Sequence, residues 1–223
     1  MPYTGSMTPE QAQVVDEGLG APYVATRYAS CLGGRSVKRL LALGFLKITG
    51  WTTNGGRPVA RRYVLIAAPH TSNWDLPYLL AFAWLYGVSI SWMGKRQLFS
   101  PPIGWIMRAL GGIPVQRHKS SDMVSQMARV IDESKSICLV VPAEGTRAYV
   151  PHWKSGFYHI ARTANVPIVL SYLDYSRRVG GFGPEIVPTG DVRSDMEEIR
   201  DFYADTQGKF PELFGDVRLK EEM

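Results

Sequence analysis

One histidine and one aspartate, five residues apart, are the first pair in this sequence whose types could do chemistry together. His70 and Asp75 lie in the stretch APHTSNWDLP, residues 68–77. A carboxylate that holds an imidazole fixes its tautomer and stabilises the imidazolium ion, so that the histidine can act as a general base. The sequence has no G-x-S-x-G nucleophile motif. Such a base would therefore act directly on a substrate hydroxyl.

The spacing of this pair limits how the two side chains can meet. On a continuous helix, residues five apart point about 140° away from each other. A loop histidine can instead reach an aspartate in the first turn of the next helix. Thr71, Ser72 and Asn73 are all cap formers, so we expect a helix to begin there. Taken alone, the pair is more simply a helix cap with an incidental histidine. A metal site is disfavoured, because no other His or Cys stands at ligand spacing.

A carboxylate and a guanidinium follow a second apolar run. The stretch ICLVVPAEGTR leads from strand-like residues into Glu144, Gly145, Thr146 and Arg147. The planar fork of an arginine suits a phosphate, and a glycine allows the backbone to approach a ligand closely. Taken alone, this loop is more simply a surface turn with an ion pair.

Two further cations stand just past the ends of predicted strands. Lys95 follows VSISWMG, and Arg117 ends the stretch GGIPVQR. Together with Arg147 they could converge on one anion, although each alone is an ordinary surface residue. Lys154 follows the EGTR loop closely enough to line the same crevice, but the sequence gives no reason to assign it a role.

These motifs need elements that bring them together. Helical patterns of apolar residues over 120–135, over 154–165 and near Ile199 alternate with strand-like runs. This alternation predicts an α/β domain with a largely parallel central sheet flanked by helices. In such sheets, sites form beyond the carboxyl ends of the strands. The predicted strands are Tyr63–Ala67, Val88–Met93, Ile113–Gln116, Ile137–Val141 and Ile168–Leu173.

Two segments of the sequence are apolar enough to raise the question of contact with a membrane. Residues 76–93 lack charge, but Gly87 divides them into a helix-like part and a strand-like part, which predicts core elements rather than a membrane span. Residues 36–51 are apolar with basic ends, and they suit either a helix packed on the domain or an interfacial helix. We therefore predict an N-terminal amphipathic helical segment over 1–58 and an α/β domain over 59–223.

Composition sets broad limits on the function. A chain of 223 residues with 45% hydrophobic content can form one domain with a substantial core. Its net charge of +5 favours anionic partners such as phosphates, nucleic acid or anionic lipid. Two cysteines, Cys31 and Cys138, make no disulfide framework, which favours a reducing compartment.

The order of the motifs resembles that of the glycerolipid acyltransferases of the lysophosphatidic acid acyltransferase superfamily. That family has four blocks, and their counterparts here are HTSNWD, GGIPVQR, EGTR and VPIV, over roughly residues 60–190. Two positions depart from its usual pattern. Pro69 stands where the family often has Asn, and Leu170 where the fourth block often ends in Pro. The departures leave the acceptor open. The resemblance implies a fold similar to glycerol-3-phosphate acyltransferase.

The resemblance also implies a reaction. A fatty acyl group would pass from acyl-CoA or acyl-carrier protein to a hydroxyl of a lysophospholipid, with lysophosphatidate as the default acceptor. The acyl donor is a substrate, and neither a cofactor nor a metal is implied. His70 would deprotonate the acceptor hydroxyl, and Asp75 would orient His70.

The same resemblance assigns the acceptor phosphate to Arg117, Glu144 and Arg147. Because a glutamate cannot itself attract phosphate, Glu144 would orient Arg147 or bind an acceptor hydroxyl. Gly145 and Thr146 complete that loop, and Lys95 is added from its place at a strand end.

Other functions remain open at this point. The acceptor could be an amino-acid lipid or a glycolipid, or the chain could be an inactive lipid-binding relative, although the intact His70–Asp75 pair argues against the last. A nucleic-acid partner is not expected, because the basic residues are dispersed and no binding motif is present. A lipid acceptor places the enzyme at the cytoplasmic face of a membrane, peripheral or monotopic, with residues 36–51 as the anchor. The sequence does not indicate an oligomeric state.

Overall fold

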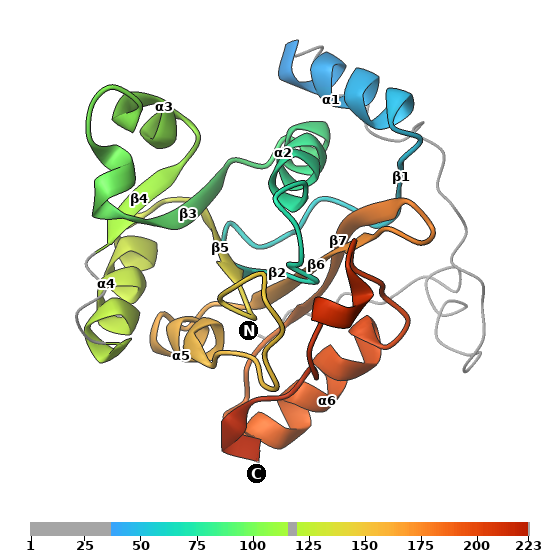
Figure 1. The fold of residues 1–223 in the computed structure, drawn as a ribbon. Coiled ribbons are helices and arrows are strands. Elements are labelled where there is room, and N and C mark those ends of the chain that lie inside the picture. Colours follow the sequence, from blue (N-terminus) through green and yellow to red (C-terminus); the bar gives the residue numbers. More distant parts are fainter. Residues whose placement is uncertain (1–36, 116–119, 223) are drawn as a thin grey trace, which may run out of the picture.

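The computed structural model describes residues 37–115 and 120–222. Within these ranges the chain forms a seven-stranded sheet with helices on both faces (Figure 1). The strands are β1 (Thr52–Thr53), β2 (Arg62–Ala67), β3 (Ile90–Lys95), β4 (Gly112–Val115), β5 (Ile137–Pro142), β6 (Ile168–Asp174) and β7 (Val179–Ile186). The helices are α1 (Val37–Ile48), α2 (Asp75–Tyr86), α3 (Gly104–Ala109), α4 (Ser120–Glu133), α5 (Gly156–Thr163) and α6 (Val192–Tyr203), with 3-10 turns η2 (Arg96–Phe99), η3 (Pro211–Leu213) and η4 (Lys220–Glu222).

The strand order is β1-β7-β6-β2-β5-β3-β4. All pairs are parallel except β6 and β7, so β7 and β1 run opposite to the other five strands. The predicted α/β class with a largely parallel sheet is thus confirmed. The central strands are continuous apolar runs because helices bury both of their faces.

Two hydrophobic cores lie on the two faces of the sheet. Along β2, Val64 and Ile66 enter one core while Leu65 enters the other, as the two-residue repeat of a strand requires. Helices α4, α5 and α6 cover the first face, and α1 and α2 cover the second (Figure 1).

The uncharged segment 76–93 divides as expected. Helix α2 ends at Gly87, whose left-handed backbone (φ +67°) lets its N–H reach the carbonyl groups of Ala83 and Trp84. Strand β3 then begins at Ile90. Among the residues that the structure describes, no helix is long and apolar enough to cross a membrane.

The predicted N-terminal helix is present as α1, and it lies against α2 rather than on the sheet. Ala42 and Leu46 are buried between the two helices. After the helix, Trp51 is buried and β1 joins the sheet beside β7. The described part of the N-terminal segment therefore packs onto the domain, while the boundary at residue 58 stays a prediction.

Several elements were not expected from the sequence. Strand β7 contains three glycines and a proline, which strands usually avoid, and it forms because it pairs with β6 along its length. Strand β1 has only two residues. Between β3 and β4, η2 and α3 form a short excursion at the edge of the sheet, near the β4 label in Figure 1.

Candidate active site

The two loops that carry the predicted site leave neighbouring strands. β2 and β5 are paired in parallel, with Ala67 opposite Pro142 at their carboxyl ends. His70 therefore lies three residues beyond β2, and Glu144 lies two residues beyond β5, so both lie at the carboxyl ends of these central strands. This arrangement brings together two motifs that are 74 residues apart in the chain.

The side chains of His70 and Asp75 lie close together at these strand ends. The Nδ1 atom of His70 lies 3.3 Å from Oδ2 of Asp75. The histidine side chain is 23% exposed and the aspartate side chain 7% exposed, so the pair is screened from bulk water but remains accessible from one side. With Nδ1 directed at the carboxylate, Nε2 is the nitrogen left to accept a proton. This is the arrangement of a general base held by a carboxylate.

The helix that carries Asp75 begins later than predicted. α2 starts at Asp75 itself, and the residue before it caps the helix without a side-chain hydrogen bond. Instead, Asp75 Oδ2 accepts the N–H of Ser72 at 2.9 Å, so the carboxylate closes the turn from inside the helix. Thr71 is not a cap either, because its hydroxyl accepts the N–H of Phe210. The expected helix start at residues 71–73 was therefore wrong by two to four positions.

A second hydroxyl holds the other oxygen of Asp75. Tyr175, one residue beyond β6, donates its hydroxyl to Asp75 Oδ1 at 2.7 Å. Burial and the neighbouring carboxylate raise the pKa of Tyr175, which keeps the hydroxyl protonated and able to donate. Asp75 therefore has a partner on each oxygen in addition to His70.

Glu144 is hydrogen-bonded to the backbone of the histidine loop. Its side chain is fully buried, and Oε1 accepts the backbone N–H of His70 at 3.0 Å. Its other oxygen, Oε2, is buried without a hydrogen-bond partner among the described residues. The sequence predicted that Glu144 would orient Arg147 or bind an acceptor hydroxyl. In the structure its carboxylate is fully buried and bonded to the histidine loop, and it makes no ion pair with Arg147. Burial raises the pKa of Glu144 to about 7, although the hydrogen bond from His70 opposes the shift.

The rest of the EGTR loop turns outward. Gly145 adopts a left-handed conformation (φ +70°), with its N–H bonded to the carbonyl of Pro142. The Thr146 hydroxyl accepts the N–H of Ala148, which shapes the turn. Arg147 is exposed and makes no ion pair with any residue that the structure describes. Its guanidinium is therefore available to a ligand.

A cavity of about 620 Å³ lies beside the dyad. His70, Asp75, Arg147, Lys154 and Tyr172 are its charged or titratable lining residues. The rest of its wall is mostly apolar and comes from both faces of the sheet. Lys95 is exposed at the end of β3 and does not line the cavity, and Arg117 lies outside the described residues. The apolar lining includes Leu76, Leu79, Phe82, Trp92, Ile160 and Leu173.

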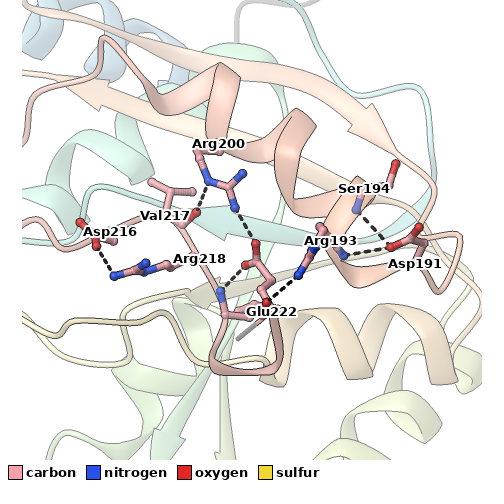
Figure 2. A network of polar contacts seen from close by, with 9 residues as sticks. Asp191, Arg193, Ser194, Arg200, Asp216, Val217, Arg218 and Glu222 are labelled. Carbon is pink, nitrogen blue, oxygen red and sulfur yellow. Dashed lines mark hydrogen bonds and ion pairs between the residues drawn. The ribbon is translucent and has the colours of Figure 1, made fainter.

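The C-terminal segment, residues 204–222, joins the two site loops. Near its start, Phe210 bonds to Thr71 in the histidine loop. Further on, a β-bridge joins Leu219 to Trp153, next to Lys154. Figure 2 shows how the end of this segment is fixed, with Arg200 of α6 bonded to the side chain of Glu222 and to the carbonyl of Val217.

A protein-family match covers this same region of the chain. The model of the family described as Acyltransferase matches residues 52–172, which include the dyad, the EGTR loop and five of the strands of the central sheet. The chain belongs to the acyltransferase family. The resemblance recognised from the four sequence blocks is thereby confirmed.

The chain is also similar to a solved structure. The crystal structure of the 1-acyl-sn-glycerophosphate (LPA) acyltransferase PlsC from Thermotoga maritima has a TM-score of 0.49 to the chain and 16% sequence identity. The similarity covers 75% of this chain and 74% of that one. No curated protein matches the sequence.

Two residues of the acyltransferase site were not assigned from the sequence. Tyr175 lies 100 residues after Asp75, and a lone tyrosine after a strand carries no motif. Lys154 lines the cavity with Arg147, and its N–H bonds to the carbonyl of Ala143, which fixes the loop after EGTR. Its only signal was its position a few residues after Arg147.

The buried carboxyl of Glu144 predicts how the stability of the acyltransferase depends on pH. A carboxyl group with a raised folded-state pKa contributes most below its unfolded pKa, near 4.5, and this contribution is lost as pH rises through about 7. Relative to Glu144→Gln, the wild-type free energy of unfolding should fall by up to about 3 kcal/mol between pH 4.5 and 8. Urea unfolding of both proteins at these pH values measures the difference. Parallel stabilities would show that Glu144 ionises normally.

Proposed function

We propose that this acyltransferase moves a fatty acyl group from an acyl thioester, acyl-CoA or acyl-carrier protein, to the hydroxyl of a lysophospholipid, with lysophosphatidate as the first candidate. The observation that carries the proposal is the position of the His70–Asp75 dyad beside a mostly apolar cavity. Two basic side chains, those of Arg147 and Lys154, also line this cavity. The cavity volume lies within the range of about 300–1,000 Å³ that is usual for ligand pockets.

The reaction needs only one base. His70 Nε2 takes the proton of the acceptor hydroxyl as its oxygen attacks the thioester carbonyl carbon. The imidazolium that forms is stabilised by Asp75, which is 3.3 Å away. The tetrahedral intermediate then collapses, the C–S bond breaks, and the imidazolium returns its proton to the leaving thiolate. The products are the acylated lipid and the free thiol, and the dyad is restored.

The lining of the cavity suits the two substrates. Apolar side chains such as Leu79, Phe82 and Leu173 provide a water-poor surface for an acyl chain. Arg147 and Lys154 lie at the polar part of the same cavity and suit the phosphate of the acceptor. Thus both the lipid tail and the anionic headgroup have complementary side chains beside the dyad.

The class of acceptor is tested by a screen. Purified enzyme, acyl-CoA and a set of acceptors are combined, and release of the free thiol is recorded. Lysophosphatidate is expected to give the fastest acceptor-dependent release. Faster release with an amino-acid lipid or a glycolipid would replace lysophosphatidate as the acceptor, and no acceptor-dependent release would contradict the proposed reaction.

Arg147→Ala is expected to raise KM for lysophosphatidate by about tenfold and to leave kcat within about twofold, because the guanidinium binds the phosphate before and during the reaction. KM for 1-acylglycerol, which lacks the phosphate, should not change. Arg61→Ala is a matched control. Arg61 is an exposed arginine just before the amino-terminal end of β2, whereas the site lies beyond the carboxyl end of that strand. An equal KM increase for both acceptors would remove Arg147 from the phosphate site.

A membrane surface is the place where this enzyme would meet its acceptor. α1 supports that role, because its outer face exposes Val37, Leu40, Leu41 and Ile48 while its inner face packs on α2. Lys47 in the last turn is also exposed. Exposed apolar residues with flanking lysines suit an anionic bilayer surface. The η2–α3 excursion exposes further apolar side chains, those of Leu98, Ile103 and Trp105.

Replacing both Leu40 and Leu41 by Glu is expected to weaken membrane binding by about tenfold or more, because the change removes apolar surface and adds negative charge. Co-sedimentation with vesicles of phosphatidylcholine and phosphatidylglycerol measures the effect. Val187→Glu is the control, since Val187 is equally exposed but follows β7 at the far edge of the sheet. Unchanged sedimentation of the double variant would exclude α1 as the contact.

A further inference from the structure

We propose that Tyr175 is a positioning residue of the acyl transfer, which holds the Asp75 carboxylate so that its other oxygen faces His70. The inference rests on the proposed function, because it assigns Tyr175 a role in the reaction of His70. Tyr175 lies outside the four motif blocks of the sequence, and it reaches Asp75 from the end of β6.

The contacts of Asp75 divide between its two oxygens. Oδ2 accepts the N–H of Ser72 and faces Nδ1 of His70. Oδ1 accepts the hydroxyl of Tyr175 at 2.7 Å. A carboxylate held only at Oδ2 could rotate about its terminal torsion, which is broad for aspartate. The Tyr175 hydroxyl fixes that torsion, and it thereby fixes the direction in which Oδ2 meets the imidazole.

Tyr175 is itself anchored at three points. Its backbone N–H bonds to the carbonyl of Gln207 at 2.9 Å. Its ring meets Trp51 edge-on at 4.9 Å and Tyr78 at 5.9 Å. Its hydroxyl bonds to Asp75. A residue whose backbone and ring are both held by other residues can set the position of its partner rather than follow it.

The ring contacts extend to α1. We call the side chains of Phe45, Trp51, Tyr78 and Tyr175 the aromatic cluster. Within it, Trp51 lies 4.3 Å from Tyr78, and Phe45 of α1 lies 5.1 Å from Tyr78. Aromatic pairs at these separations are attractive beyond their buried area. The helix proposed for the membrane surface is thus connected to the dyad through packed rings.

The experiment compares Tyr175→Phe with Tyr78→Phe. The first removes the hydroxyl that bonds to Asp75 but keeps the ring. The second removes a hydroxyl from the aromatic cluster without touching the contacts of Asp75 described above. Tyr175→Phe is expected to lower kcat about tenfold, since a hydrogen bond to a charged group is lost, with both KM values within about twofold. Tyr78→Phe should leave kcat within about twofold, and the melting temperatures should be compared for both.

A double-mutant cycle separates positioning from a general loss of structure. If Tyr175 acts through Asp75, Tyr175→Phe added to Asp75→Ala, which leaves no side-chain oxygen for the Tyr175 hydroxyl, should cause almost no further loss of kcat. A full tenfold further loss in that background, or a kcat of Tyr175→Phe within twofold of wild type, would overturn the inference. The wild-type enzyme and the His70→Ala variant keep this result separate from the proposed function. No acceptor-dependent thiol release by the wild type contradicts the function, and wild-type release by His70→Ala contradicts the role of His70 as base. Failure of the Tyr175 effect alone contradicts only the positioning role.

Discussion

His70→Ala is expected to reduce kcat by about 10³-fold or more while the fold is retained. The loss follows because, among the described residues, no other histidine lines the cavity, and Asp75, its carboxylate, already has partners on both oxygens. Glu144 is buried under the histidine loop. General-base catalysis alone accounts for about 10²- to 10⁴-fold. Release of free thiol from acyl-CoA in the presence of lysophosphatidate gives the rate.

His159→Ala is the control for that experiment. His159 lies on α5 with a half-exposed side chain, and it pairs with Glu221 rather than with the site. Its replacement should leave kcat within about twofold. Acceptor-dependent thiol release at the wild-type rate by His70→Ala would show that another group takes the proton.

Asp75→Asn is expected to lower kcat by about 10²- to 10⁴-fold with little change in KM, because the negative charge that stabilises the imidazolium is lost. The geometry can survive the change. The amide oxygen can take the place of Oδ2 and accept from Ser72, while the amide nitrogen faces Tyr175. A tyrosine hydroxyl can accept as well as donate, so it can reverse its role.

Steady-state kinetics and thermal unfolding of Asp75→Asn together test this reading. A large kcat loss with a melting temperature near that of wild type would assign the effect to charge. A kcat within a factor of about three of wild type would mean that His70 needs no carboxylate, and the dyad would then be a structural pair.

The strand ends explain why much of the site was predictable from the sequence. β2 and β5 are apolar runs followed at once by HTSNWD and EGTR, and parallel neighbours deliver their loops to one edge. Local pattern and tertiary structure agree there, so His70, Asp75 and Arg147 could be grouped before any coordinates. The end of helix α2 was likewise predictable, because Gly87 follows it, whereas its start at Asp75 was not.

The role of Glu144 was not predictable for a different reason. Glu144 begins the sequence EGTR, and a Glu so near Arg147 suggests a surface turn with an ion pair. Only the packing of the histidine loop over β5 buries the carboxyl and pairs it with a backbone N–H. Tyr175 was missed because its partner is 100 residues away. Strand β7 was missed because pairing with β6 outweighs the weak strand preference of its glycines.

The tie between the two site loops has a consequence for the order in which the protein folds. Phe210 follows Thr71 by 139 residues, and the β-bridge of Leu219 is made after every strand of the sheet has been synthesised. Contacts of such high sequence separation form late, since a long loop must close first. A nascent chain can thus assemble its central strands before the segment that joins the histidine loop to the loop after EGTR has emerged. We therefore expect competence for acyl transfer to be acquired near the end of folding, when the sheet that supports the dyad is already in place.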